Sequence, residues 1–124
     1  MLPMDDRFVE AVELFNAAEF FACHDVLEEV WSEALDDSRD FYQGLIHAAV
    51  SLFHFTEGNF GGARKMYDST LKYLSAYPDQ YGGVDLGVFR EQYVRCFVPL
   101  VNWTSGYPQG LAVETETLPQ LLLL

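Results

Sequence analysis

The residues of this 124-residue chain best suited to chemistry are its three histidines and the carboxylates beside them. His24 and Glu28 are four residues apart, so on a helix they lie on one face, one turn apart. His47 and His54 are seven residues apart and also share a helical face. Imidazole nitrogens and carboxylate oxygens are ligands of Zn²⁺ and of other first-row divalent ions. If the two segments form an antiparallel hairpin, the spacing predicts a divalent metal site between them.

The distance between the two later histidines limits the set of ligands that can bind one ion. His47 and His54 are two helical turns apart, about 10 Å along the axis, so both cannot readily bind one ion. The realistic sets are His24 and Glu28 with either His47 or His54, and we predict His24, Glu28 and His54 as the metal ligands. Gln43 lies on the same line as the later histidines and would orient a ligand.

The same side chains have two other interpretations. They could form a buried network in which Glu28 or Asp25 accepts a hydrogen bond from a histidine and Gln43 satisfies the remaining groups. They could also act as a general acid and base without a metal. The complete candidate site consists of the polar residues His24, Asp25, Glu28, Gln43, His47 and His54.

Apolar residues at helical spacing predict five helices that must position these side chains. The expected ranges are 5–17, 20–35, 39–57, 60–76 and 86–103. Residues 39–57 are apolar almost all round, which is typical of a buried central helix. Residues 78–85 are expected to form a loop, and only 111–113 resembles a strand. The fold class is therefore all-α: a five-helix bundle of antiparallel helical hairpins with an extended C-terminal tail.

One helical domain is expected over residues 1–103. Residues 104–124 contain turn signals and are expected to form a tail that packs on this body or on a partner subunit. Several apolar side chains and both cysteines are expected in the core, the cysteines as free thiols: Phe20, Phe21, Cys23, Trp31, Cys96 and Trp103.

A turn is expected between the third and fourth helices. Gly58 suits the left-handed position after a helix, and Asn59 can cap the next helix. Gly62 and Ala63 are small enough to let paired helices approach closely. A similar pattern occurs forty residues earlier, at 18–23. This faint repeat resembles the helical hairpins of tetratricopeptide proteins.

Charge limits the classes of partner. Seven Lys and Arg oppose nineteen Asp and Glu, and the net charge is −12. Residues 1–57 hold 13 of the acids and only two bases, a net charge of −11. This balance argues against binding to nucleic acid and to an anionic membrane surface. The acidic half is either a solvated surface, or a docking face for a basic partner or a cation site.

Targeting signals are not found in the sequence. The first ten residues are acidic and contain no apolar run of the kind found in signal peptides. No stretch approaches the roughly 20 apolar residues of a membrane helix. Two cysteines are too few for a disulfide framework. These features predict a cytoplasmic protein.

Three separated motifs agree in order with one known family. They are His24-Asp25-x-Leu27-Glu28-x-x-Trp31, then Arg39-Asp40-Phe41-x-Gln43-Gly44-Leu45-Ile46, and Gly58-Asn59-x-x-Gly62-Ala63. Over about residues 8–75 the chain resembles the small all-helical proteins grouped as domain-of-unknown-function family 309. The resemblance implies an α-helical bundle and no established activity.

The resemblance also bears on the candidate site. It implies that His24, Glu28, Gln43 and His54 are the set to test. The family usually has Glu where this chain has Asp25, a change that keeps the charge. It often has Gln where this chain has His47, which weakens the case for His47 as a required ligand.

Two functions from different classes follow. The first is a non-catalytic interaction or binding module, whose partner is another protein or a second copy of the chain. The second is a metal-binding protein or a metal-dependent hydrolase that uses a His/Glu site between the second and third helices. The residues leave open whether the protein is an enzyme.

Overall fold

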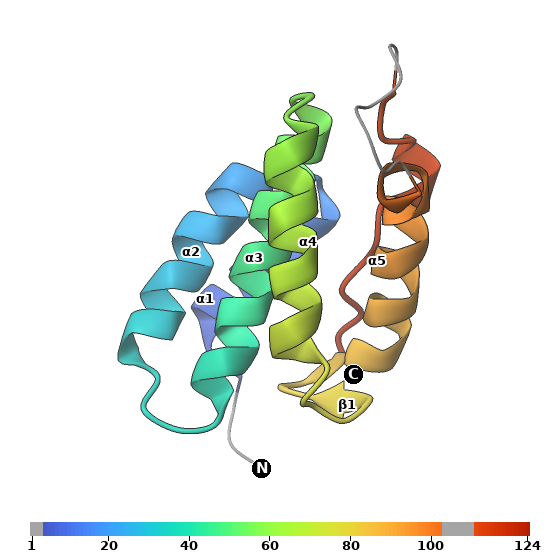
Figure 1. Ribbon diagram of the computed structural model, residues 1–124. Helices are drawn as coiled ribbons and strands as arrows, with labels where there is room; N and C mark the ends of the chain where they lie inside the picture. Colours follow the sequence, from blue (N-terminus) through green and yellow to red (C-terminus); the bar gives the residue numbers. More distant parts are fainter. Residues whose placement is uncertain (1–3, 103–110) are drawn as a thin grey trace.

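The computed structural model describes residues 4–102 and 111–124. These residues contain five α-helices, which are drawn in Figure 1: α1 (Asp6–Asn16), α2 (Phe20–Glu33), α3 (Ser38–Thr56), α4 (Phe60–Leu74) and α5 (Leu86–Val101). The predicted all-α class is confirmed, and each helix begins within one residue of its expected position. No helix in the described part of the chain is long and apolar enough to span a membrane.

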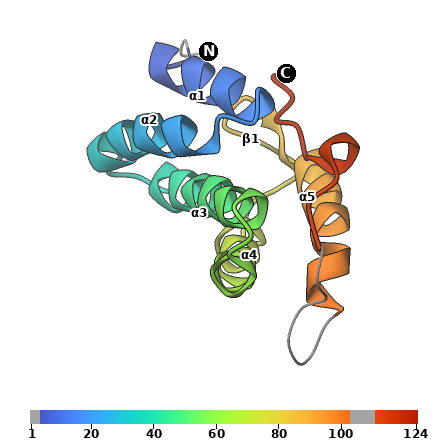
Figure 2. The same cartoon turned by 90° about the horizontal axis from the view of Figure 1, so that it is seen from above.

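The first four helices pack in chain order. α1 contacts α2, α2 contacts α3, and α3 contacts α4. Figure 2 shows these helices as an arc, with α5 on its inner side. Nine residues of α3 are buried, which confirms the expected central helix. α3 therefore supports both neighbouring helices.

α5 closes the inner side of the arc through aromatic contacts. Phe89 meets Phe15 of α1 edge to face, with ring centroids 5.5 Å apart. Tyr93 stacks on Tyr67 of α4 at 5.4 Å, and its hydroxyl lies 2.6 Å from Oγ of Ser51 in α3. Such aromatic pairs bury large apolar areas with a defined geometry. α5 thus connects α1, α3 and α4 in one core.

Two turns separated by forty residues have the same backbone geometry. After α1, Ala18 has a φ of 62°, and after α3, Gly58 has a φ of 79°. In each turn the following residue donates its backbone N–H to a carbonyl five residues back, at 2.9 Å from Glu19 and 2.8 Å from Asn59. This 6→1 bond and the left-handed residue define a Schellman motif. The faint sequence repeat therefore corresponds to a repeated helix ending.

Exchanging the residues at these two turns should change stability in opposite directions. Ala18→Gly is expected to raise the free energy of unfolding by about 0.5 kcal/mol, because relief of left-handed strain exceeds the entropy cost of glycine. Gly58→Ala is expected to lower it by about 1 kcal/mol. A Cβ at Gly58 would meet no atom within 4 Å, so the effect reports backbone conformation alone. Urea unfolding measures both changes, and a destabilised Ala18→Gly variant would contradict this explanation.

The segment that was expected to be a loop contains the sheet. β1 (Gln80–Tyr81) pairs antiparallel with β2 (Val84–Asp85). Gly82 and Gly83 connect them, with φ values of 62° and 80°, as a two-residue hairpin of this kind requires. The segment 111–113, which resembles a strand in sequence, has no regular secondary structure. Strands of two residues are too short to show an alternating pattern.

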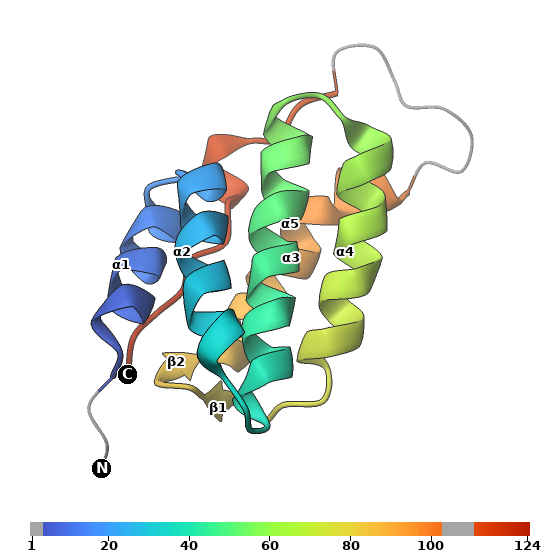
Figure 3. The ribbon, with the colours of Figure 1, turned by 90° about the vertical axis from the view of Figure 1, so that its left-hand side faces the viewer.

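The C-terminal residues pack on the body beside β2 (Figure 3). Asn16 holds the backbone of Leu121 with two hydrogen bonds: its Nδ2 donates to the carbonyl at 2.9 Å, and its Oδ1 accepts from the N–H at 2.8 Å. Leu121 is only 2% exposed, and Leu123 forms an antiparallel bridge with Val84. The expected domain boundary near residue 103, with Trp103 itself, lies outside the described residues.

Removing the Asn16 side chain should release the end of the chain. Asn16→Ala deletes both hydrogen bonds and is expected to lower the free energy of unfolding by about 1–3 kcal/mol. Carboxypeptidase digestion should then remove the last residues faster than it does in the wild type. Asn102→Ala is the control, since Asn102 is an exposed asparagine that follows α5 directly. Equal digestion rates of all three proteins would contradict the assigned role of Asn16.

Candidate functional site

A pocket of about 150 Å³ opens between α2 and α3. It brings together two histidines of the candidate site, and its other lining residues are apolar; the full lining is Phe20, Phe21, His24, Val50, Phe53 and His54. Phe21 was expected in the core, but 57% of it is exposed. Its ring contacts those of His24 and Phe53, with centroids 5.1 and 5.5 Å apart. Phe21 is therefore an exposed aromatic wall held in a defined orientation.

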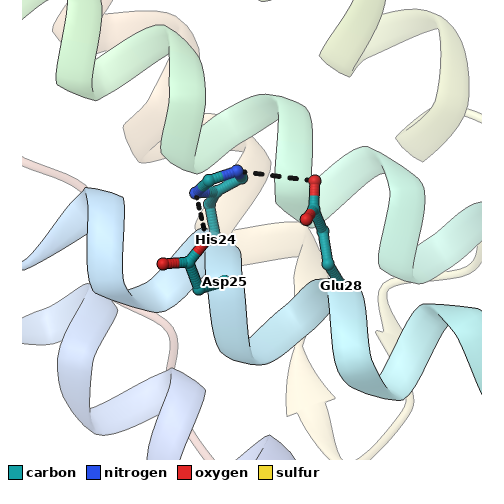
Figure 4. Close-up of side chains that lie close together, drawn as sticks. All are labelled: His24, Asp25 and Glu28. Atoms are coloured by element: carbon teal, nitrogen blue, oxygen red, sulfur yellow. Dashed lines mark ion pairs between the residues drawn. The ribbon is translucent and has the colours of Figure 1, made fainter.

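His24 is held by atoms on both sides of its ring (Figure 4). Its Nδ1 lies 2.9 Å from the carbonyl oxygen of Phe21 and 3.5 Å from Oδ1 of Asp25. Its Nε2 lies 3.4 Å from Oε1 of Glu28. A carbonyl can only accept, so Nδ1 donates to it. A neutral ring then has its lone pair at Nε2, facing the carboxylate.

α2 places His24 and Glu28 at the border between core and solvent. Cys23 and Leu27, next to them in sequence, are buried. The end of α2 is held by Arg39 of α3, whose guanidinium donates to the carbonyls of Trp31 and Ala34, both at 3.1 Å. The same group lies 4.0 Å from the centre of the Trp31 ring. Trp31, expected in the core, is therefore half-buried beneath an arginine.

His54 has a different hydrogen-bond environment. The backbone N–H of Gly62 donates to Oδ1 of Asn59 at 3.1 Å, which caps α4. The amide nitrogen of Asn59 therefore faces His54 and donates to its Nδ1 at 3.3 Å. In a neutral ring the hydrogen is then on Nε2. This arrangement makes His54 a donor rather than a ready metal ligand.

The turn residues predicted from the sequence position this cap. Gly58 takes the left-handed conformation, and Asn59 follows it as the N-cap of α4. A Cβ at Gly62 would lie 2.8 Å from the Asn59 amide nitrogen, so glycine leaves space for the capping side chain. Ala63 is fully buried.

Gln43 and His47 lie away from the pocket, on the side of α3 that faces α4. The Gln43 amide is 2.7 Å from Nε2 of His47, and Nδ1 of His47 is 2.7 Å from Oγ of Ser69. The His47 ring meets Tyr73 edge to face at 5.2 Å. The candidate site therefore separates into two groups. Ser69 and Tyr73 were missed by the sequence reasoning, and their signal is their own four-residue spacing on α4.

Burial lowers the pKa of His47 below its ordinary value of about 6.5. Below that pH His47 is protonated more readily in the unfolded chain than in the folded chain. The free energy of unfolding therefore falls as the pH falls from about 7 to about 5. His47→Gln should reduce this pH dependence, because glutamine does not titrate. Urea midpoints at both pH values measure it, with His54→Gln as the control that leaves His47 in place. An unchanged pH dependence in His47→Gln would show that His47 does not cause it.

The two cysteines are buried, as expected, and are poor nucleophiles. Burial raises the pKa of Cys23 to about 12 and that of Cys96 to about 11. Both therefore remain thiols near neutral pH.

Two larger hollows flank the loop between α2 and α3, with volumes of about 380 and 590 Å³. Neither includes a residue of the candidate site. In the smaller one Arg7 pairs with Asp5 and Glu33. In the larger one the Tyr77 hydroxyl donates to the Asp37 carbonyl. These polar groups stabilise the loop, and the α2–α3 pocket remains the candidate site.

Comparison with known proteins places this region in a family. Residues 8–66 match the family described as Domain of unknown function (DUF309). This part of the chain is similar to the proteins of that family. It covers α1, α2, α3 and the first part of α4, and it ends nine residues before the expected limit at 75. Both groups of the candidate site begin within it, but Ser69 and Tyr73 lie beyond its end.

Two curated relatives of the DUF309 region are themselves uncharacterised. A protein of Aquifex aeolicus is 34% identical over 82 residues, which are 65% of this chain and 25% of the relative. The protein YpuF of Bacillus subtilis is 33% identical over 66 residues, which are 52% of this chain and 38% of the relative. The chain thus spans less than two-fifths of either relative.

Proposed function

We propose that this protein is a non-catalytic binding module whose α2–α3 pocket receives an apolar side chain of a basic protein segment. The observation that carries the proposal is Phe21, an exposed aromatic ring held by His24 and Phe53 at the mouth of an apolar pocket. Exposed aromatic anchors beside a preformed pocket are typical of protein-binding surfaces.

The charge around the pocket supports a basic partner. α2 contains no Lys or Arg, and its solvent face exposes four carboxylates, those of Asp25, Glu28, Glu29 and Glu33. Glu33 is paired with Arg7 of α1. The other three carboxylates are nearer the pocket, and α2 has no basic residue to pair with them. A cationic segment gains from this field both in rate and in selectivity. The net charge of −12 likewise supports a protein partner over nucleic acid or an anionic membrane.

His54 adds a polar contact to an otherwise apolar lining. Because Asn59 donates to its Nδ1, the neutral ring offers its Nε2 hydrogen. A backbone carbonyl of a bound segment is a suitable acceptor. Pockets of this kind take their affinity from apolar contacts and their orientation from a few placed donors.

Titration with defined peptides tests the proposal. An amphipathic peptide of Leu and Lys should shift the amide NMR signals of residues around Phe21, His24 and Phe53, and the binding should weaken with added salt. A Leu and Glu peptide tests the charge, and a Ser and Lys peptide tests the apolar anchor. Neither should bind in this way. Equal binding of the Leu and Glu peptide, or shifts located elsewhere, would overturn the proposal.

A pair of exposed residues provides matched variants. Phe21→Ser is expected to weaken binding of the Leu and Lys peptide at least about thirtyfold, because a hot-spot aromatic contributes about 2 kcal/mol or more. Leu35→Ser is the control, since Leu35 is 96% exposed and lies just beyond the C-terminal end of α2. Thermal unfolding checks that both variants are folded. If both variants bind like the wild type, the pocket is not the binding surface.

Self-association through the same pocket has a distinct signature. A second copy of the chain in this pocket would give a solution mass that rises with protein concentration and falls in Phe21→Ser. Such a result would identify the ligand of the pocket as a second copy of this chain rather than a basic segment of another protein.

A further inference from the structure

We propose that the hollow between the start of α3 and β1 binds a primary alkylammonium ion, the group found in polyamines and at the end of a lysine side chain. This hollow is the larger of the two described above, with a volume of about 590 Å³. Its charged and aromatic lining residues are Asp36, Asp37, Arg39, Asp40, Tyr77 and Tyr81. None of them lines the α2–α3 pocket, so a failure of the peptide experiment leaves this proposal standing.

Two tyrosine rings form the aromatic wall of the hollow. The ring centroids of Tyr77 and Tyr81 are 4.5 Å apart, and both side chains are half-buried. Each ring meets the buried ring of Phe41 edge to face, at 5.8 Å from Tyr77 and 4.9 Å from Tyr81. The Tyr77 hydroxyl also donates to the carbonyl of Asp37. Rings held in this way lose little conformational freedom when a ligand binds.

The β1–β2 hairpin positions Tyr81. Tyr81 pairs with Val84, which is fully buried, so the backbone of the short strand is fixed to the core. A Cβ placed on Gly82 would lie 2.6 Å from Cε2 of Phe41, and glycine therefore lets the turn lie directly on that ring. The wall of the hollow is thus built on the core rather than on a free loop.

Three carboxylates line the same hollow, and two of them have no partner. Asp36 accepts hydrogen bonds from the backbone N–H of Ser38, at 2.9 Å, and from its hydroxyl. Asp37 lies at the N-cap position of α3, but its side chain makes no capping bond. Within residues 4–102 and 111–124, the carboxylates of Asp37 and Asp40 form no ion pair and accept no hydrogen bond. Both are available to accept from an N⁺–H donor.

The guanidinium in the lining is already used at the end of α2. Arg39 donates to the carbonyls of Trp31 and Ala34 and lies 4.0 Å from the centre of the Trp31 ring. Negative charge is therefore in excess in the hollow. Burial raises the pKa of Tyr81, and the charges of Asp36 and Asp37 raise it further. The same negative potential favours a cation beside that ring.

The combination of groups selects an organic ammonium ion. The face of an aromatic ring attracts a cation, and it also packs against methylene groups. Carboxylates form strong hydrogen bonds with ammonium groups. A hydrated metal ion would gain nothing from the rings, and a neutral alkyl group would gain nothing from the carboxylates. The volume of the hollow is in the range of small-molecule sites.

NMR titration of the untagged full chain tests the site, with n-butylammonium chloride as the probe. We expect saturable shifts of the amide signals of Tyr77, Tyr81 and Asp40. Matched concentrations of 1-butanol, which lacks the charge, and of KCl, which lacks the alkyl chain, should not produce them. Equal shifts with KCl, an absence of saturation, or shifts located elsewhere would overturn the proposal.

Two further probes identify the source of the ammonium group. The first is 1,4-diaminobutane, which represents free polyamines, and the second is an acetylated Ala-Lys-Ala amide, which represents a lysine of a protein segment. If the diamine binds more tightly than n-butylammonium, the ligand is a free polyamine. If the peptide binds more tightly, the ligand is a lysine side chain. Either result supports the ammonium site.

The carboxylates can be tested one at a time. Asp37→Asn and Asp40→Asn each remove one charge and should weaken binding of n-butylammonium about two- to fivefold. Glu57→Gln removes the same charge from an exposed residue at the opposite end of α3 and should bind like the wild type. An equal effect of all three variants would show that net charge alone attracts the probe, and would overturn the site.

A matched pair of variants tests the aromatic wall. Tyr81→Phe keeps the ring and should bind n-butylammonium like the wild type. Tyr81→Leu keeps an apolar side chain without the ring and should weaken binding about two- to fivefold. Thermal unfolding checks that both variants are folded, and the two Asp variants test the site even if Tyr81→Leu is not. Equal binding by folded Tyr81→Leu and Tyr81→Phe would contradict the role of the ring.

Discussion

The close approach of α3 and α4 is the contact on which the rest of the architecture depends. A Cβ placed on Gly44 would lie 2.5 Å from Cδ2 of Leu74, so only glycine permits this separation of the two helices. At that separation Ala48, Ala49 and Leu52 of α3 are fully buried. Close-packed interiors do not absorb an added methyl group without movement. Since α2 packs on the other side of α3, the position of the pocket depends on this contact too.

The C-terminal ends of α2 and α4 are each stabilised by an arginine from the following helix. Arg39 donates to the last carbonyls of α2, and Arg90 donates to the carbonyls of Leu74 and Tyr77 at 2.8 and 2.7 Å. The last carbonyls of a helix have no partner within the helix and carry partial negative charge. α2 has no basic residue in its last turn, so Arg39 supplies the charge from outside. This capping stabilises the end of α2 where the chain turns into α3.

Residues with local roles were predictable from the sequence, and those with contacts across helices were not. Asp5 and Asn59 cap helices through bonds to residues two and three positions ahead, so their patterns are visible in the sequence. The hydrogen-bond partner of His47 is Ser69 of α4, which is twenty-two residues away in the sequence. Because α3 has a neighbouring helix on each side, the sequence alone does not show which helix this side chain contacts. His47 and His54 share one line along α3, but His47 turns to α4 and His54 turns to the cap at Asn59. Helical spacing predicts which residues share a face of a helix, but it does not predict which of two neighbouring helices each side chain contacts.

The exposure of Phe21 follows from the same limit. Phe20 and Phe21 are adjacent in sequence, and a helix places neighbours about 100° apart, so both enter the core only if α2 is covered on a wide arc. Phe20 is buried against Phe15 of α1, whereas Phe21 lies at the open edge beside His24. The ring is therefore part of the surface, and it contacts the imidazole whose other edge faces Glu28. His24 thus belongs both to the apolar pocket and to the carboxylate pair. Because one ring contributes to both, its orientation depends on the apolar contact with Phe21 and on the charge of Glu28.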